Sequence, residues 1–168
     1  MQKITIYCDG ACQGNPGKSG SGIAVYYTGE EKPVLYYGNH EEKGTNNSAE
    51  LGALYAALKI ASEANLGEEI TILSDSKYSI DCITKWAYGW ASKGWTKRGG
   101  PIKNLDLIKQ AHSLYNTMKD SISIAHVKGH SGVEGNELAD RMAGFAIKQK
   151  NVEYETYEYS SIREVLSL

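Results

Sequence analysis

The hydrophobic pattern of this chain changes its period several times, and the resulting order of strands and helices limits the folds that it can adopt. Residues 3–9 alternate apolar and polar side chains, which predicts a strand. Residues 22–28 and 33–39 are rich in Tyr, Val and Ile and are bounded by turns that contain Gly and Pro. Three strands this close in sequence predict an antiparallel meander.

Helices and strands alternate after this meander. A helix is expected to start after Asn46, with Asn47 as its N-cap and Glu50 at the capping-box position and on the inward face. The later segments are expected to be a strand at 69–75, a helix at 76–86, a helix at 103–119, a strand at 121–127 and a helix at 135–150. The order β-β-β-α-β-α-α-β-α predicts an α/β fold, in which a five-stranded mixed sheet carries helices on both faces.

The length of 168 residues suits a single domain with one core. We predict that residues 1–150 form this domain and that 151–168 form a tail, either partly ordered with a short helix at 161–166 or disordered. No apolar run approaches the roughly 20 residues of a membrane helix. The N-terminus enters a strand pattern without the features of a signal peptide. We therefore expect a cytoplasmic monomer with no membrane partner.

Charge is distributed unevenly along the chain. The net charge of −2 does not favour nucleic-acid binding, but five cations and no acid lie between Cys82 and Leu105, together with all three tryptophans. This segment fits either a packed helical hairpin with a solvated face or a surface that grips a phosphate backbone. Its cationic and tryptophan residues are Lys85, Trp86, Trp90, Lys93, Trp95, Lys97, Arg98 and Lys103.

Four acidic residues stand out by their positions. Asp9 is expected to end the first strand and Asp75 the fourth, while Glu50 lies on the inward face of the first helix and Asp140 on the last helix. Any one of them has an ordinary interpretation, as a turn residue, a capping-box glutamate or a solvated helix residue. If the first and fourth strands are neighbours, however, Asp9 and Asp75 meet at adjacent strand ends, where sites collect in open α/β sheets.

Four carboxylates brought together would repel one another unless a cation neutralised them. No lysine or arginine is placed in the sequence to pair with them all. Oxygen ligands favour Mg²⁺, with Mn²⁺ as a possible substitute, over zinc. Two such ions would clamp the attacking water and the leaving oxygen of a phosphodiester, which is the chemistry of a nuclease.

Five short motifs carry a resemblance to a known family. They are DGACQGNPG at 9–17, TNNSAEL at 45–51, SDS at 74–76, HVKGHSG at 126–132 and GNELAD at 135–140. Their order and spacing over about residues 3–147 resemble the type 1 ribonucleases H. The resemblance implies the ribonuclease H-like fold, two Mg²⁺ ions held by Asp9, Glu50, Asp75 and Asp140, and endonucleolytic cleavage of the RNA strand of an RNA–DNA hybrid. It also implies products with 5′-phosphate and 3′-hydroxyl ends.

The resemblance further assigns roles outside the four acids. His130 resembles the family's mobile histidine, which assists proton transfer or product release, and an imidazole side chain suits such a role. The tryptophan-rich basic segment resembles the family's protrusion that grips the DNA strand. The residues that resemble hybrid-binding groups are Lys43, Thr45 and Asn104 in a DNA phosphate pocket, and Cys12, Asn15, Asn46 and Asn47 along the minor groove. Contacts to 2′-hydroxyls distinguish RNA from DNA.

One position departs from the family pattern. Lys77 stands where relatives often carry a glutamine or an apolar residue. Its charge would either add a phosphate or groove contact or slightly lower metal affinity, and the sequence leaves both open.

Three other interpretations are weighed against this one. A different nuclease on the same fold would cleave DNA. The motif from His130 to Asp140 and the tryptophan-rich basic segment disfavour this interpretation. A non-catalytic hybrid-binding module would be expected to have lost at least one of the four acids. A detached retroviral-type domain would share the chemistry but require a polymerase partner.

Overall fold

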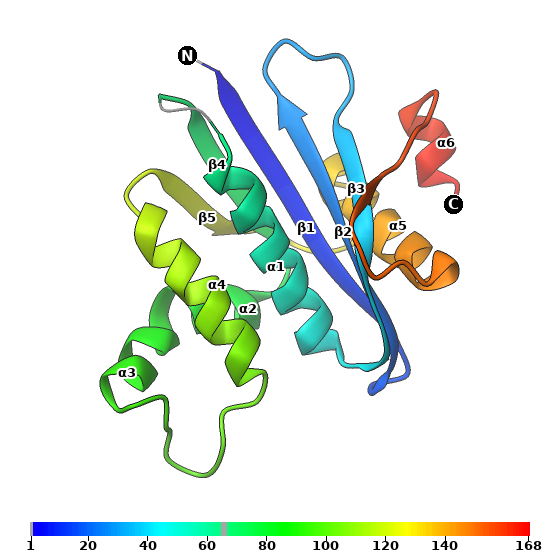
Figure 1. Ribbon diagram of the computed structural model, residues 1–168. Coiled ribbons are helices and arrows are strands. Elements are labelled where there is room, and N and C mark those ends of the chain that lie inside the picture. The colour runs from blue at the N-terminus through cyan, green and yellow to red at the C-terminus, as the bar shows by residue number, and fades with distance from the viewer. Residues whose placement is uncertain (1, 65–66) are drawn as a thin grey trace.

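The protein is described here by a computed structural model that covers residues 2–64 and 67–168. A six-stranded mixed sheet forms its centre, with strand order β5-β4-β1-β2-β3-β6 (Figure 1). The strands are β1 (Lys3–Gln13), β2 (Gly17–Tyr27), β3 (Val34–Gly44), β4 (Glu69–Ser74), β5 (Ile122–His126) and β6 (Glu155–Thr156). β1, β2 and β3 pair antiparallel, as the meander predicts, whereas β4 pairs parallel with both β1 and β5.

The prediction of five strands was wrong by one, and the extra strand comes from the C-terminal tail. β6 pairs antiparallel with β3 through Tyr36 and Tyr37. The tail then forms α6 (Ile162–Leu166), whose N-cap Ser161 accepts a hydrogen bond from the Glu164 amide. Val165 of this helix is fully buried. Within residues 151–168, β6 therefore joins the sheet and α6 packs against α5 (Glu134–Gln149).

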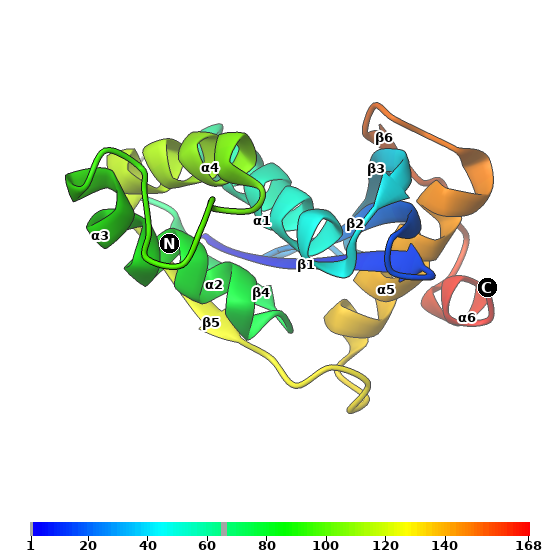
Figure 2. The same ribbon diagram turned by 90° about the horizontal axis from the view of Figure 1, so that it is seen from below.

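Helices cover both faces of the sheet, as expected. On one face lie α1 (Asn46–Ser62) and α4 (Leu105–Met118), and on the other lie α5 (Glu134–Gln149) and α6 (Figures 1 and 2). The larger core lies under α1 and α4, and a smaller one joins Leu35 of β3 to Leu138 and Met142 of α5 and to Val165. No helix within residues 2–64 and 67–168 is long and apolar enough to cross a membrane.

The helical region after β4 is longer than predicted. It comprises α2 (Lys77–Asp81), a π-helical turn (Cys82–Trp86) and α3 (Ala87–Ser92). Ser76 caps α2 through the Ser79 amide, as its position predicts. In the helix before β4, α1, the N-cap is Thr45 and not Asn47, because Thr45 and Ser48 form a reciprocal capping box. Glu50 is thereby freed from the capping role and is available to the site.

Asp9 does not end β1, contrary to the prediction, because β1 continues to Gln13 by pairing with β2. Its side chain is positioned by two neighbours. In the parallel pairing of β1 with β4, Cys8 lies opposite Ser74, so that Asp9 and Asp75 follow at adjacent positions. On the α1 side, the Cα of Gly10 lies so close to this helix that a Cβ there would overlap the backbone of Ala49 and Glu50. The start of α1 is thus held directly beside Asp9.

Candidate active site

Three carboxylates from β1, α1 and the end of β4 meet at one place. Oxygens of Asp9, Glu50 and Asp75 all lie within 4.8 Å of one another. The Gly10 amide donates to both Asp9 Oδ1, at 2.9 Å, and Glu50 Oε1, at 2.8 Å. Only 4% of Asp9 is exposed. The strand pairing and the close approach at Gly10 therefore bring these three acids together as the sequence predicted.

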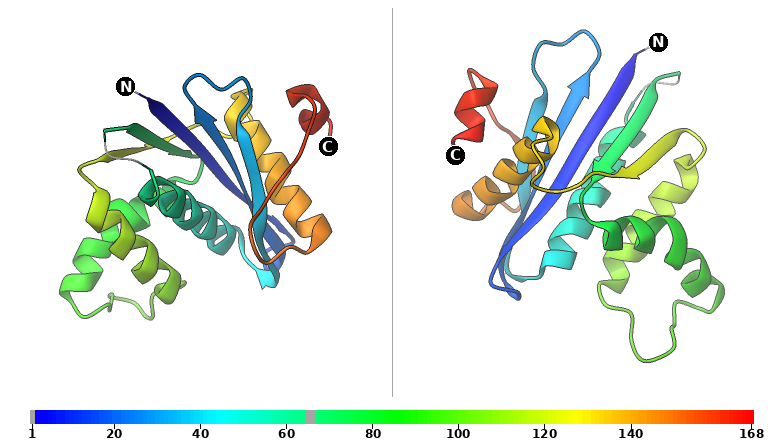
Figure 3. Two further views of the ribbon diagram at one scale, coloured as in Figure 1. Left: turned by 45° about the horizontal axis from the view of Figure 1, so that its top comes forward. Right: turned by 180° about the vertical axis from the view of Figure 1, so that it is seen from behind.

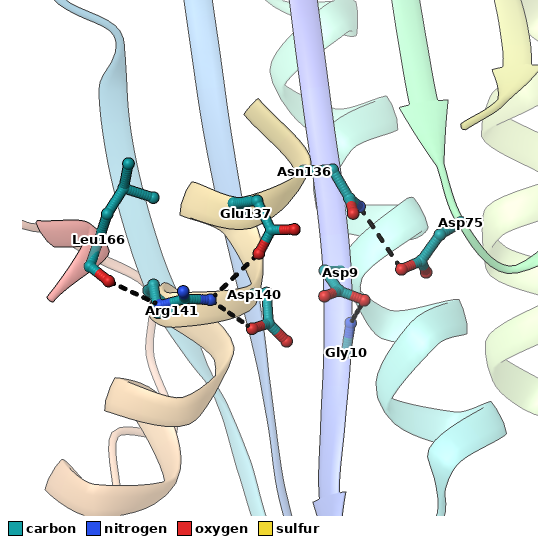
Figure 4. A network of polar contacts seen from close by, with 8 residues as sticks. All are labelled: Asp9, Gly10, Asp75, Asn136, Glu137, Asp140, Arg141 and Leu166. Carbon is teal, nitrogen blue, oxygen red and sulfur yellow. Dashed lines mark hydrogen bonds and ion pairs between the residues drawn. The ribbon is translucent and has the colours of Figure 1, made fainter. Parts of the chain in front are cut away.

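Asp140 faces the same place from α5, on the other side of β1. Figure 4 shows Asp9 between Asp140 on one side and Asp75 on the other. Asp140 also belongs to a second group, in which ligand atoms of His130, Glu137 and Asp140 lie within 4.8 Å of one another. We call Asp9, Glu50, Asp75 and Asp140 the carboxylate site.

The carboxylate site carries a large unfavourable charge density in the absence of a cation. Burial raises the pKa of Asp9, and the neighbouring Glu50, Asp75 and Asp140 raise it further. Burial likewise raises the pKa of Glu50 to about 7, although hydrogen bonds from Asp9 and Gly10 oppose the shift. Desolvation and like charge both favour the protonated form of a carboxyl group. Around Asp9 and Glu50, the site therefore favours a positive charge.

Two observations fit a metal ion as that charge. Glu50 Oε2 is buried and has no hydrogen-bond partner within the part of the chain that the structure describes. Among the same residues, no lysine or arginine forms an ion pair with Asp9, Glu50 or Asp75. An unsatisfied buried oxygen is costly unless it gains a partner. The donor set consists of carboxylate oxygens, which suit Mg²⁺ or Mn²⁺.

The raised pKa values give a prediction for stability without metal. In EDTA, we expect the wild-type protein to lose stability relative to Glu50→Gln as pH rises from about 4.5 to about 7. A group whose pKa is higher in the folded state contributes stability that is complete below its unfolded pKa and is lost as pH rises through its folded pKa. Urea denaturation of both proteins across this range measures the difference. A constant difference would contradict the raised pKa of Glu50.

Three further residues of this region were missed by the sequence analysis. Asn136 is buried, and its Nδ2 donates to Asp75 Oδ2 at 3.4 Å. Glu137 and Arg141 form an ion pair at 3.2 Å, and Arg141 pairs with Asp140 at 2.9 Å. The spacing of Asn136 and Glu137 from Asp140, four and three residues, places all of them along one side of α5 and was the available signal.

His130 lies in the loop that passes from β5 to α5 (Figure 3). Its side chain is exposed, as predicted, and its backbone has a φ of 53°. Left-handed backbone is uncommon for residues other than Gly, although Asn, Asp and His adopt it more readily than most. A ring nitrogen of His130 comes within 4.8 Å of carboxylate oxygens of Glu137 and Asp140. The loop therefore places an imidazole at the rim of the carboxylate site.

The tryptophan-rich basic segment includes α3 and the long loop after it, which form a lobe at one end of the molecule (Figures 1 and 3). Trp90 and Trp95 pack against the main core, and Trp95 also contacts His112 edge-on. Trp86 is 43% exposed and lies beside Trp90. Lys93, Lys97 and Arg98 are exposed. The lobe thus combines both interpretations: two tryptophans are structural, whereas one tryptophan and the cations face solvent.

The residues expected to line the groove and the phosphate pocket come from the ends of β1 and β3, the turn before β2, the start of α1 and the position before α4. Thr45 caps α1 through its side chain, and the Asn15 side chain accepts a hydrogen bond from the backbone amide of Asn46 at 2.9 Å. The side chains of Thr45 and Asn15 therefore have structural partners. Cys12 Sγ lies 3.1 Å from the Gly14 carbonyl. The exposed members of the set are Asn15, Lys43, Asn46 and Asn47, and Lys77 is exposed as well. Asn104, partly exposed, precedes α4 and has no side-chain capping bond.

Comparison with known proteins identifies similar sequences and structures. A family model described as RNase H matches residues 1–148. A Ribonuclease H of Chromohalobacter salexigens is 42% identical over 147 residues, which are 87% of this chain and 85% of that protein. The crystal structure of LC9-RNase H1, described as a type 1 RNase H with the type 2 active-site motif, has a TM-score of 0.80 and 25% identity over 96% of this chain and 79% of that one. LC11-RNase H1, solved in complex with RNA/DNA hybrid, has a TM-score of 0.63 and 21% identity over 88% of this chain and 98% of that one.

Proposed function

The chain belongs to the RNase H family and is a ribonuclease, and we propose that its carboxylate site hydrolyses the RNA strand of an RNA–DNA hybrid with the help of two divalent metal ions. The observation that carries the proposal is the convergence of Asp9, Glu50 and Asp75 within 4.8 Å, with Glu50 Oε2 buried and unpaired among the described residues. The products are then 5′-phosphate and 3′-hydroxyl ends.

The four carboxylates would hold the ions, and Figure 4 shows Asp9 at their centre, between Asp140 and Asp75. Mg²⁺ is the proposed ion, and Mn²⁺ is a substitute, because both ions bind carboxylate oxygens. When bound, the two ions supply the positive charge that favours attack by water and stabilises the leaving 3′ oxygen. The protein's own contribution is to hold the carboxylates in position, through the Gly10 amide for Asp9 and Glu50 and through Asn136 for Asp75.

We assign His130 an auxiliary role in moving a proton to or from the reacting groups. Its exposed position beside Glu137 and Asp140 leaves the imidazole within reach of both solvent and the carboxylate site. An imidazole changes charge near neutral pH, which suits proton transfer. His130 lies on a loop and not on a strand or helix, so its movement requires no change in the sheet.

The hybrid is proposed to lie across the start of α1 toward the basic lobe. The polar side chains of Asn46 and Asn47 would meet the minor groove with Cys12 and Asn15, where 2′-hydroxyls distinguish RNA. Lys43, Thr45 and Asn104 would hold a DNA phosphate, with the ammonium of Lys43 acting as a point charge. The exposed Trp86 and the cations of the lobe, Lys93, Lys97 and Arg98, would grip the DNA strand, with Trp90 and Trp95 supporting them. Lys77 is exposed at the start of α2, and its charge would either add a phosphate or groove contact or slightly lower metal affinity.

Cleavage of a labelled RNA–DNA hybrid tests the proposal. We expect the protein with Mg²⁺ to cut only the RNA strand of the hybrid and to leave single-stranded RNA, duplex RNA and duplex DNA intact. EDTA should stop the reaction, because the carboxylate site then lacks its counter-charge. Folded protein that binds the hybrid without cutting it in Mg²⁺ or Mn²⁺ would identify a binding module. Cutting of duplex DNA would identify a different nuclease on the same fold.

A further inference from the structure

Arg141 connects the carboxylate site to the C-terminal end of the chain. Its Nη1 donates to Asp140 Oδ2 at 2.9 Å and to Glu137 Oε2 at 3.2 Å. Its Nε donates to the backbone carbonyl of Leu166 at 3.2 Å. Figure 4 shows the guanidinium between these two carboxylates and the tail. One planar group therefore joins two acidic side chains of α5 to a main-chain oxygen of α6.

The acceptor on the tail is held firmly in place. Leu166 follows Val165, which is fully buried in the smaller core with Leu138 and Met142 of α5. The turn of α6 before it is fixed by its cap, in which Ser161 accepts a hydrogen bond from the Glu164 amide. The carbonyl of Leu166 thus has a defined position relative to α5, and it fixes the direction of the Arg141 side chain.

The contact with Asp140 is of the kind that orients a metal ligand. Arg141 donates a hydrogen bond to Oδ2 of Asp140, which leaves the other oxygen of this carboxylate available to bind an ion. The side chains of Arg141, Asp140 and Glu137 are 28%, 30% and 19% exposed, so the pairs are more sheltered than a typical surface ion pair. Groups that hydrogen-bond a metal ligand fix its orientation, and losing them typically lowers metal affinity or activity by about 10- to 100-fold.

We propose that Arg141, held by the carbonyl of Leu166, is a positioning residue that fixes Asp140 and Glu137 for metal binding and makes the C-terminal segment part of the active site. This rests on the proposed function, since it assumes that Asp140 is a metal ligand. The positive charge of Arg141 opposes an incoming cation, but this effect is screened at a partly exposed position. Without Arg141, Asp140 would rotate freely beside an unneutralised Glu137. We expect this loss of orientation to lower metal affinity by more than the removal of the positive charge raises it.

Arg141→Lys separates orientation from charge. Lysine keeps the positive charge but lacks the planar fork that reaches two carboxylates and a carbonyl together. We expect its affinity for Mn²⁺, measured by calorimetry without substrate, to fall about 10-fold. The melting temperature in EDTA should stay close to that of the wild type. In cleavage assays, the loss of rate in Arg141→Lys should become smaller as the Mg²⁺ concentration is raised, because a higher concentration restores occupancy of the metal site. The matched control is Arg163→Lys, an exposed arginine of α6, which should leave Mn²⁺ affinity unchanged.

Shortening the chain tests the contribution of the tail. A chain that ends at Val165 lacks the carbonyl of Leu166 and should lose Mn²⁺ affinity in the same direction as Arg141→Lys. A chain that ends at Ser167 keeps Leu166 in a peptide bond, with its carbonyl as the acceptor, and should bind as the wild type does. Wild-type affinity in both Arg141→Lys and the shorter chain would overturn the proposal, as would a cleavage defect of Arg141→Lys that Mg²⁺ does not reduce. Calorimetry needs no cleavage, so a wild-type protein that binds Mn²⁺ but cuts nothing would refute the proposed function and still decide the role of Arg141.

Discussion

Asp9→Asn is expected to abolish cleavage while leaving the fold intact. Asp9 lies between Asp140 and Asp75, so its loss removes the central one of the four carboxylates that would hold the ions (Figure 4). The loss of activity should exceed the roughly 100-fold that removal of a group behind a metal ligand costs. Asparagine has nearly the same shape as aspartate, and its oxygen can still accept from the Gly10 amide as Asp9 Oδ1 does at 2.9 Å. Cleavage rates on labelled hybrid and calorimetric Mn²⁺ binding measure the effect.

The same substitution should stabilise the protein when metal is absent. Burial and three neighbouring carboxylates raise the pKa of Asp9, so an uncharged side chain removes a repulsion there. We expect the free energy of unfolding in EDTA to rise by about 1 kcal/mol or more, given about 1.4 kcal/mol per pKa unit. His130→Ala, which leaves all four carboxylates in place, serves as the comparison and should keep part of the activity. Full activity of folded Asp9→Asn would refute the metal site.

The sequence predicted the positions of the four acids better than their local structure. Asp75 follows a strand that is parallel to β1, so its closeness to Asp9 requires only that the two strands are neighbours. The place of Asp9 within β1 was not predictable, because residues 10–13 lack an alternating apolar pattern and owe their strand structure to pairing with β2. The capping box of Thr45 and Ser48 was missed for a related reason: adjacent polar residues compete for the cap, and only the path of the chain decides.

The structure of the C-terminal tail and its contact with Arg141 depend on tertiary structure more than the positions of the four acids do. β6 has two residues, which is too short to leave a periodic signal. Its pairing is imposed by β3, which offers a free edge. The contact between Arg141 and Leu166 joins positions 25 residues apart through a backbone carbonyl, which no side-chain pattern encodes. In the basic lobe, composition alone did not separate the supporting tryptophans, Trp90 and Trp95, from the exposed Trp86.

Gly10→Ala is expected to damage both stability and activity. A Cβ at this position would overlap the backbone of Ala49 and Glu50, and backbone atoms cannot move aside as the end of a flexible side chain can. Overpacking typically costs about 1–3 kcal/mol, and here we expect the upper end of that range or more. For a chain of this length, about 3 kcal/mol corresponds to a fall in melting temperature of roughly 6–12 °C. Activity should fall as well, because α1 carries Glu50 and would be displaced from Asp9.

A second glycine provides the matched control for Gly10→Ala. Gly89 lies inside α3, and a Cβ there would meet no atom within 4 Å. Gly89→Ala should therefore be neutral or stabilising by about 0.5–1 kcal/mol, because alanine favours a helix. Thermal unfolding of both variants in EDTA separates the steric effect from any loss of bound metal. If Gly10→Ala were as stable as Gly89→Ala, α1 would not lie against β1 as described, and the arrangement that brings Glu50 to Asp9 would be wrong.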